Sequence, residues 1–182
     1  MSTITVHVPA VTEAPAAAID LAERRGLEGA RLGLVDNGKP RAGALLQMLG
    51  KELQETYGVA EVVMISKGSA GIPLDDVQVA DLASRVDLAV TGLGDCGACS
   101  ACSLQDALML ERAGVASTVL ITEVFVPIVA RFAASLGAPG YHSLVVPHPV
   151  ATKDDDWLHG LARSVLSAAT VQLGEPALVS AG

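Results

Sequence analysis

The chain has 182 residues, of which 51% are hydrophobic and only 3% aromatic, and its formal net charge is −8. This length suits one domain with a complete core, and the aliphatic composition favours a parallel sheet covered by helices over a β-sandwich. The negative charge argues against nucleic acid and anionic membrane surfaces as partners. We expect neither a membrane span nor a secretion signal, and therefore a cytoplasmic protein.

The chain is expected to divide into an N-terminal arm or short helix over residues 1–29, an α/β domain over residues 30–173 and a tail over residues 174–182. In the first part, Thr3–Val8 alternates polar and apolar residues, which suits an edge strand or an ordered arm. A short helix is predicted over Ala14–Arg25, with Gly26 at its end.

Strand and helix patterns alternate along residues 30–173. Core strands are expected at Ala30–Val35, Glu61–Ile65, Asp87–Thr91, Ser117–Thr122 and Ser143–Val146. Helices are expected at Ala44–Tyr57, Leu74–Val86, Leu104–Ala113, Val124–Leu136 and Asp154–Gln172. Ser103 and Asp106 resemble a capping box at the start of the third helix. The alternation predicts a single three-layer α/β domain with about five parallel strands, flavodoxin-like or Rossmann-like in strand order.

All three cysteines lie in one glycine-containing loop between the third strand and the third helix. Cys96, Cys99 and Cys102 are spaced three residues apart. The thiolate is the reactive form of cysteine, and a helix N-terminus favours it. Gly94 and Gly97 allow tight turns and the close approach of a ligand to the backbone. The neighbouring Asp95 opposes this effect, unless its carboxylate points away from Cys96 or acts as a base toward bound substrate.

Three interpretations of these cysteines remain open at this point. In the first, Cys96 attacks a substrate and Cys99 resolves the product as a disulfide, for which the Cys-x-x-Cys spacing is suited. In the second, Cys96, Cys99 and Cys102 hold a metal ion or an iron–sulfur cluster, with a fourth ligand from His148, Asp95, water or substrate. In the third, the cysteines are small packing residues beside a tight turn.

Further polar residues follow other predicted strands, and the carboxyl ends of parallel strands form the ligand crevice of an open α/β sheet. Lys39 can bind a carboxylate or phosphate, and Asn37 can bind a substrate oxygen or complete the turn. Glu123 can cap the following helix or act as a general acid. His148 lies between two prolines and is a candidate acid/base, thiolate partner or metal ligand.

Three blocks of the sequence resemble one family. They comprise Leu34–Pro40, the loop and helix from Gly94 to Val115, and Val145–Pro149. Together they resemble the UGSC family, which is named for a Sec-Gly-Ser-Cys motif. Its members are expected to be thiol or selenol oxidoreductases. The loop also resembles, more faintly, the Sec-x-x-Cys-x-x-Cys segment of the selenoprotein B subunit of glycine reductase.

The resemblance implies chemistry by a soft nucleophile. Position by position, Cys96 falls on the selenocysteine and Cys99 on the resolving cysteine. Ala98 replaces the serine of the motif, and Cys102 stands where a non-cysteine residue is expected. That extra thiol favours the metal interpretation.

We therefore expect an enzyme that acts on a small molecule through Cys96 and Cys99. Cys102 would be a third thiol or a ligand, and no nucleotide cofactor is implied. A small thiol or a thioredoxin-type partner would supply the electrons. The alternatives are a metal-binding or iron–sulfur protein and a noncatalytic subunit that presents the loop to a partner enzyme. The aliphatic helix faces are compatible with a homo-oligomer.

Overall fold

The structure is a computed structural model that describes residues 17–174. The strands of this part are β1 (Arg31–Asp36), β2 (Glu61–Ser66), β3 (Leu88–Gly94), β4 (Ala116–Thr122) and β5 (Ser143–Val146). Its α-helices are α1 (Ala42–Tyr57), α2 (Asp76–Arg85), α3 (Gly97–Arg112), α4 (Val126–Ser135), α5 (Asp155–Ser164) and α6 (Leu166–Gly174), and a 3-10 turn, η1 (Glu123–Phe125), precedes α4.

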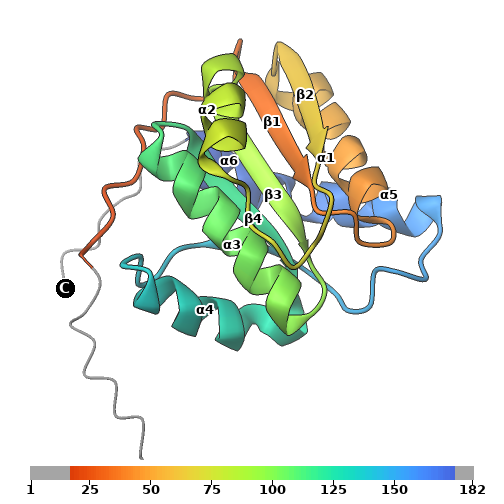
Figure 1. The fold of residues 1–182 in the computed structure, drawn as a ribbon. Coiled ribbons are helices and arrows are strands. Elements are labelled where there is room, and N and C mark those ends of the chain that lie inside the picture. The colour runs from red at the N-terminus through yellow and green to blue at the C-terminus, as the bar shows by residue number, and fades with distance from the viewer. Residues whose placement is uncertain (1–16, 175–182) are drawn as a thin grey trace, which may run out of the picture.

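The five strands form one parallel sheet in the order β2-β1-β3-β4-β5. This is the flavodoxin order, so the expected α/β class with five parallel strands is confirmed. Helices α1, α5 and α6 cover one face of the sheet, and α2, α3 and α4 cover the other (Figure 1). The strand order reverses between β1 and β3, and this switch point is where ligands bind in such sheets.

The central strands explain why the composition is aliphatic. Every residue of β3 and β4 is buried, because helices cover both faces of the sheet at these positions. On one face Leu49 and Leu53 of α1 pack into a core that includes Leu34 of β1. Among residues 17–174, no helix has both the length and the apolar character needed to cross a lipid bilayer.

Helix α3 begins seven residues earlier than predicted. It starts at Gly97, with Cys96 as its N-cap, so the expected capping box of Ser103 and Asp106 is wrong. Both of those side chains are fully buried inside the helix. The amphipathic pattern fails as a guide here because α3 packs against β3, β4, α2 and α4 and is buried on most of its circumference.

Two other helix predictions need correction. The described part of the expected helix at Ala14–Arg25, residues 17–25, forms neither helix nor strand. Its backbone donors bind elsewhere, since Ile19 N–H donates to the carbonyl of Gly137 at 2.9 Å. The expected helix Asp154–Gln172 is divided at Val165 into α5 and α6, with Asp154 as N-cap of α5. The strand or arm expected at Thr3–Val8 and the tail from residue 175 lie outside the described residues.

Candidate active site

The cysteine loop lies at the switch point of the sheet. It follows β3, and the loop that carries Lys39 follows the adjacent strand β1. Backbone N–H of Asn37 donates to the carbonyl of Gly92 at 2.9 Å, so the two loops are bonded to each other. The fold therefore brings together two segments that are more than fifty residues apart in the chain.

Cys96 and Cys99 form a close pair at the first turn of α3. Their Sγ atoms are 2.7 Å apart, and neither cysteine is in a disulfide. Backbone N–H of Cys99 donates to Sγ of Cys96 at 3.2 Å, so the Cys96 sulfur occupies the place of an N-cap oxygen. Backbone N–H of Asp95 donates to Sγ of Cys99 at 3.2 Å. Cys96 is half-buried, whereas Cys99 is 1% exposed.

The two thiols have opposite pKa shifts. Burial raises the pKa of Cys96, but hydrogen bonds from the Cys99 thiol and Cys99 backbone N–H, together with the Lys39 ammonium, outweigh burial and leave this pKa below its ordinary value. Burial and the neighbouring Cys96 raise the pKa of Cys99 to about 11. Cys96 is therefore the sulfur that ionises first, and Cys99 keeps its proton while donating to it.

Asn37 holds the β1 loop in place. Its side-chain amide donates to the carbonyl of Leu93 at 2.9 Å and to Oγ of Ser103 at 3.0 Å, and the side chain is 1% exposed. Its Oδ1 accepts from backbone N–H of Lys39 at 3.2 Å. The first two bonds occupy both amide protons of Asn37. Of the two roles that the sequence left open, substrate binding and completion of the turn, Asn37 therefore has the second.

The two glycines of the predicted site differ in their surroundings. A Cβ on Gly94 would lie 2.7 Å from both Cγ2 of Ile121 and Oγ of Ser100, so close packing requires glycine there. Gly97 opens α3 and is half-buried, and a Cβ on it would lie 3.9 Å from Cδ1 of Ile128. The chain itself thus fills the space beside Gly94, and Gly97 faces the η1–α4 segment.

His148 reaches the same rim from the loop after β5. Its Nδ1 lies 3.0 Å from Oδ1 of Asp95 and 3.1 Å from Oγ1 of Thr122. The Asp95 oxygen accepts no hydrogen bond of regular geometry from the described residues, so Thr122 is the hydrogen-bond partner of the ring. The Asp95 carboxylate is directed to His148, which fits the expectation that Cys96 can ionise if this carboxylate points away.

Glu123 and Phe125 border the histidine on its outer side. Oε1 of Glu123 accepts from backbone N–H of His148 at 3.4 Å, and the ring of Phe125 meets the imidazole edge-on at 5.9 Å between centroids. Glu123 is exposed and belongs to η1. The side chain of Thr122 is fully buried and was not predicted as a site residue, because nothing in the sequence marks a threonine that contacts a histidine 26 residues away.

Cys102 lies one turn further along α3 and has different neighbours. Burial raises its pKa, Lys67 lowers it, and the charges of Asp106 and Cys96 raise it. Lys67 and Asp106 form a buried ion pair of 2.5 Å, and Asp106 also accepts backbone N–H of Leu74 at 2.7 Å. Within residues 17–174, no group of three His, Cys, Asp or Glu side chains is arranged to hold a metal ion. The metal or cluster interpretation therefore stays a prediction.

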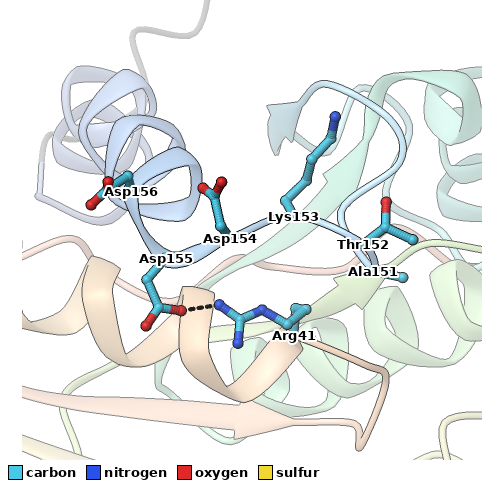
Figure 2. Close-up of a pocket in the computed structure, with 7 residues that line it drawn as sticks. All are labelled: Arg41, Ala151, Thr152, Lys153, Asp154, Asp155 and Asp156. Atoms are coloured by element: carbon cyan, nitrogen blue, oxygen red, sulfur yellow. Dashed lines mark hydrogen bonds and ion pairs between the residues drawn. The ribbon is translucent and has the colours of Figure 1, made fainter.

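A shallow polar hollow of about 600 Å³ opens at the same end of the sheet. Arg41, at the start of α1, and Asp155, at the start of α5, form an ion pair across it (Figure 2). Arg41 has a left-handed backbone with φ of 68°, which is unusual for a residue with a side chain. The hollow is lined by Arg41 and residues 151–156, and none of the cysteines contributes to it.

The fold and the site together define an α/β protein of flavodoxin strand order with a Cys-x-x-Cys pair at the switch point of the sheet. The sequence matches the UGSC family over residues 5–175, and the chain belongs to that family. No curated protein matches it. A crystal structure of the diflavin flavoprotein A3 from Nostoc sp. is similar over 80% of this chain and 96% of that chain, at 17% identity and a TM-score of 0.42.

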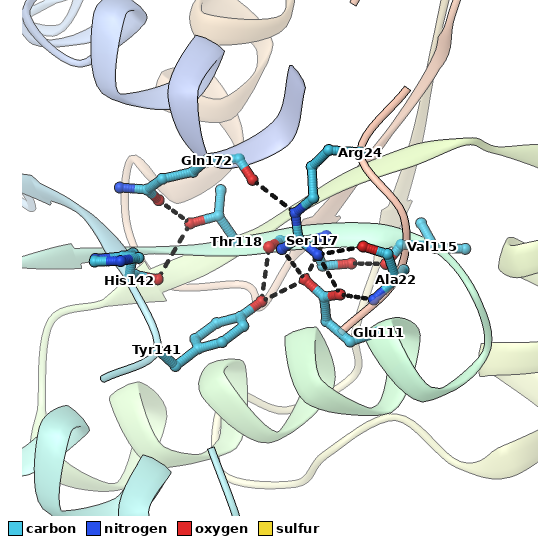
Figure 3. Close-up of polar contacts among 9 residues, drawn as sticks. All are labelled: Ala22, Arg24, Glu111, Val115, Ser117, Thr118, Tyr141, His142 and Gln172. Carbon is cyan, nitrogen blue, oxygen red and sulfur yellow. Dashed lines mark hydrogen bonds and ion pairs between the residues drawn. The ribbon is translucent and has the colours of Figure 1, made fainter. Parts of the chain in front are cut away.

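Glu111, which lies in one of the family-like blocks, is in the last turn of α3, at the opposite end of the helix from Cys96, and binds the N-terminal arm (Figure 3). Its buried carboxylate accepts from backbone N–H of Ala22 at 2.7 Å and pairs with Arg24 at 2.6 Å. It also accepts from backbone N–H of Ser117 at 2.9 Å and from the hydroxyl of Tyr141 at 3.2 Å. Burial, and then the Glu111 charge, raises the pKa of Tyr141 well above its ordinary value. This cluster holds residues 22–24 against α3 and β4.

Proposed function

We propose that this protein is a thiol-dependent oxidoreductase that reduces a small molecule with an electrophilic sulfur or a similarly soft centre. Cys96 is the nucleophile and Cys99 the resolving thiol. The observation that carries the proposal is the pair itself: two sulfurs 2.7 Å apart, with the more exposed one at a helix N-terminus and accepting a backbone N–H. Such a site favours a thiolate that attacks and a second thiol within reach of the product.

The reaction balances in two steps. Cys96 passes its proton to His148, and the resulting thiolate attacks the substrate sulfur and forms a mixed disulfide. The displaced leaving group takes that proton back from His148, which returns the ring to its neutral form. Cys99 then loses its proton to the histidine, attacks Sγ of Cys96 and releases the remaining substrate fragment as a thiolate, which is protonated in turn. The substrate gains two electrons and two protons, and the pair becomes a disulfide.

The surrounding residues have supporting roles in this proposal. Lys39 holds the Cys96 thiolate and binds an anionic part of the substrate. Asp95 and Thr122 orient His148 through Nδ1, and Glu123 holds the histidine backbone.

The test uses 2-hydroxyethyl disulfide as a probe with the reduced protein. The wild type should release two equivalents of mercaptoethanol and form a Cys96–Cys99 disulfide that peptide mapping identifies. Cys99→Ser should stop at a mixed disulfide on Cys96, and Cys96→Ser should not react. Cys102→Ser is the matched control and should behave as the wild type.

Two results would contradict the proposal. The first is a Cys96→Ser protein that reacts as fast as the wild type, since this would place the nucleophile elsewhere. The second is a stoichiometric metal in anaerobically purified protein that is lost in Cys96→Ser, since this would make the cysteines ligands.

A further inference from the structure

Exposed apolar side chains border the cysteine pair. Val124, Val126 and Ile128 are 52%, 40% and 44% exposed, and no charged residue interrupts the sequence from Val124 to Ala130. With the half-buried Phe125, these residues form a continuous stretch of η1 and the first turn of α4, which we name the apolar ridge. Single exposed apolar residues are ordinary, whereas a contiguous group indicates an interaction surface.

The ridge touches both ends of the proposed active site. Ile128 is the nearest neighbour for a Cβ on Gly97, the residue directly after Cys96. Phe125 contacts the His148 ring edge-on. A molecule that covers the ridge therefore lies beside Gly97 and His148, which adjoin Cys96 and Asp95.

The exposure of the two sulfurs indicates which kind of thiol reduces the oxidised pair at the apolar ridge. Cys99 is 1% exposed and Cys96 is half-buried, so an external thiolate reaches the oxidised pair through Cys96. A small thiol needs no apolar border for this attack. A protein thiol needs a surface beside the sulfur, and redox encounter complexes bury less than about 1,200 Å², so a short ridge is sufficient.

Resting on the proposed function, we infer that the apolar ridge docks a protein dithiol reductant of the thioredoxin type. A thiolate of the partner attacks Sγ of Cys96, the Cys96–Cys99 bond breaks, and its electron pair passes to Cys99, which accepts the backbone N–H of Asp95. The second thiolate of the partner then attacks the mixed disulfide and frees Cys96. Two electrons and two protons pass to the pair, and the partner becomes a disulfide.

The test compares two reductants on the oxidised protein. One is thioredoxin, kept reduced by its reductase and NADPH, and the other is dithiothreitol. The double variant Val126→Glu/Ile128→Glu should lower the second-order rate with thioredoxin by about tenfold or more and leave the rate with dithiothreitol within about twofold. Val77→Glu is the matched control, because Val77 is a 78% exposed valine on α2, outside the ridge.

Each other outcome has a defined meaning. Equal rates for ridge variant and wild type with thioredoxin would overturn the inference, and an equal loss with both reductants would assign the effect to a distorted site. A second copy of this chain is the rival occupant. If the ridge variant turns a dimer into a monomer in sedimentation velocity while thioredoxin still reduces it normally, the ridge is a subunit interface. If the oxidised wild type contains no Cys96–Cys99 disulfide that dithiothreitol can reduce, the proposed function itself fails.

Discussion

The hydroxyl of Thr122 lies 3.1 Å from Nδ1 of His148 and also donates to the carbonyl of Gly94 at 3.2 Å. A hydroxyl has one proton, and that proton is used toward Gly94. The ring must therefore donate from Nδ1, which leaves Nε2 of the neutral imidazole as a proton acceptor. Thr122 thus sets the tautomer in which Nε2 of His148 can accept a proton, as the proposed reaction requires.

Thr122→Val should disturb this tautomer. The variant leaves the Gly94 carbonyl without its partner and should lower the free energy of unfolding by about 1–3 kcal/mol. The ¹⁵N shifts of the His148 ring should move away from those of the Nδ1-protonated form, and the reaction with 2-hydroxyethyl disulfide should slow. Thr122→Ser keeps the hydroxyl and should preserve both signals. Unchanged ring shifts in Thr122→Val would show that Thr122 does not set the tautomer.

Lys39→Met should raise the pKa of Cys96. The Lys39 ammonium lowers this pKa in the wild type, so removing its charge should shift the alkylation midpoint upward. At neutral pH the thiolate fraction and the alkylation rate should fall accordingly. Lys153→Met, which removes a half-buried lysine that lies over Trp157, is the control and should leave the midpoint in place. An unchanged alkylation midpoint in Lys39→Met would show that Lys39 does not stabilise the Cys96 thiolate.

Glu111→Gln should release the N-terminal arm. The substitution leaves the Arg24 guanidinium, whose side chain is 9% exposed, beside a neutral group, and breaking such a buried pair costs roughly 3–5 kcal/mol. Hydrogen exchange at residues 17–25 should speed up. Glu23→Gln removes a carboxylate that pairs with Arg25 at the surface and should leave both exchange and stability unchanged. Equal exchange in Glu111→Gln and the wild type would mean that the arm is held by other contacts.

Asp106→Asn should destabilise the protein through the buried Lys67. Burial raises the pKa of Asp106, so the buried Asp106 carboxylate is unfavourable by itself. It nevertheless neutralises the Lys67 ammonium, whose side chain is only 4% exposed. Leaving Lys67 unpaired should cost about 3–5 kcal/mol in denaturant unfolding. The double variant Lys67→Met/Asp106→Asn should recover much of this loss. A double variant as unstable as the single one would show that the loss does not come from an unpaired Lys67.

The periodic parts of the fold were predictable from the sequence. The five strands were placed because buried parallel strands are continuous apolar runs, as in Leu88–Val90 and Val119–Ile121. Placing the loops at the strand ends then brought Lys39, Cys96 and His148 to one rim without knowledge of the structure. The family resemblance selected the same segments.

The contacts that depend on burial could not be predicted. Helix α3 was predicted to start too late because its first turns contain glycine, serine and cysteine rather than a stripe of leucines. Asp106 was assigned to a cap, since no sequence pattern pairs it with Lys67, 39 residues away. Thr122 and Glu111 were missed for the same reason: their partners His148 and Ala22 lie 26 and 89 residues away along the chain.

The pH dependence of alkylation at Cys96 tests the central claim most directly. With iodoacetamide and peptide mass mapping, the wild type should be labelled first at Cys96, with a midpoint below that of an ordinary cysteine. Cys99→Ala, which keeps the backbone N–H but removes the side-chain donor, should raise that midpoint. A midpoint at or above that of an ordinary cysteine, or first labelling at Cys102, would contradict the account.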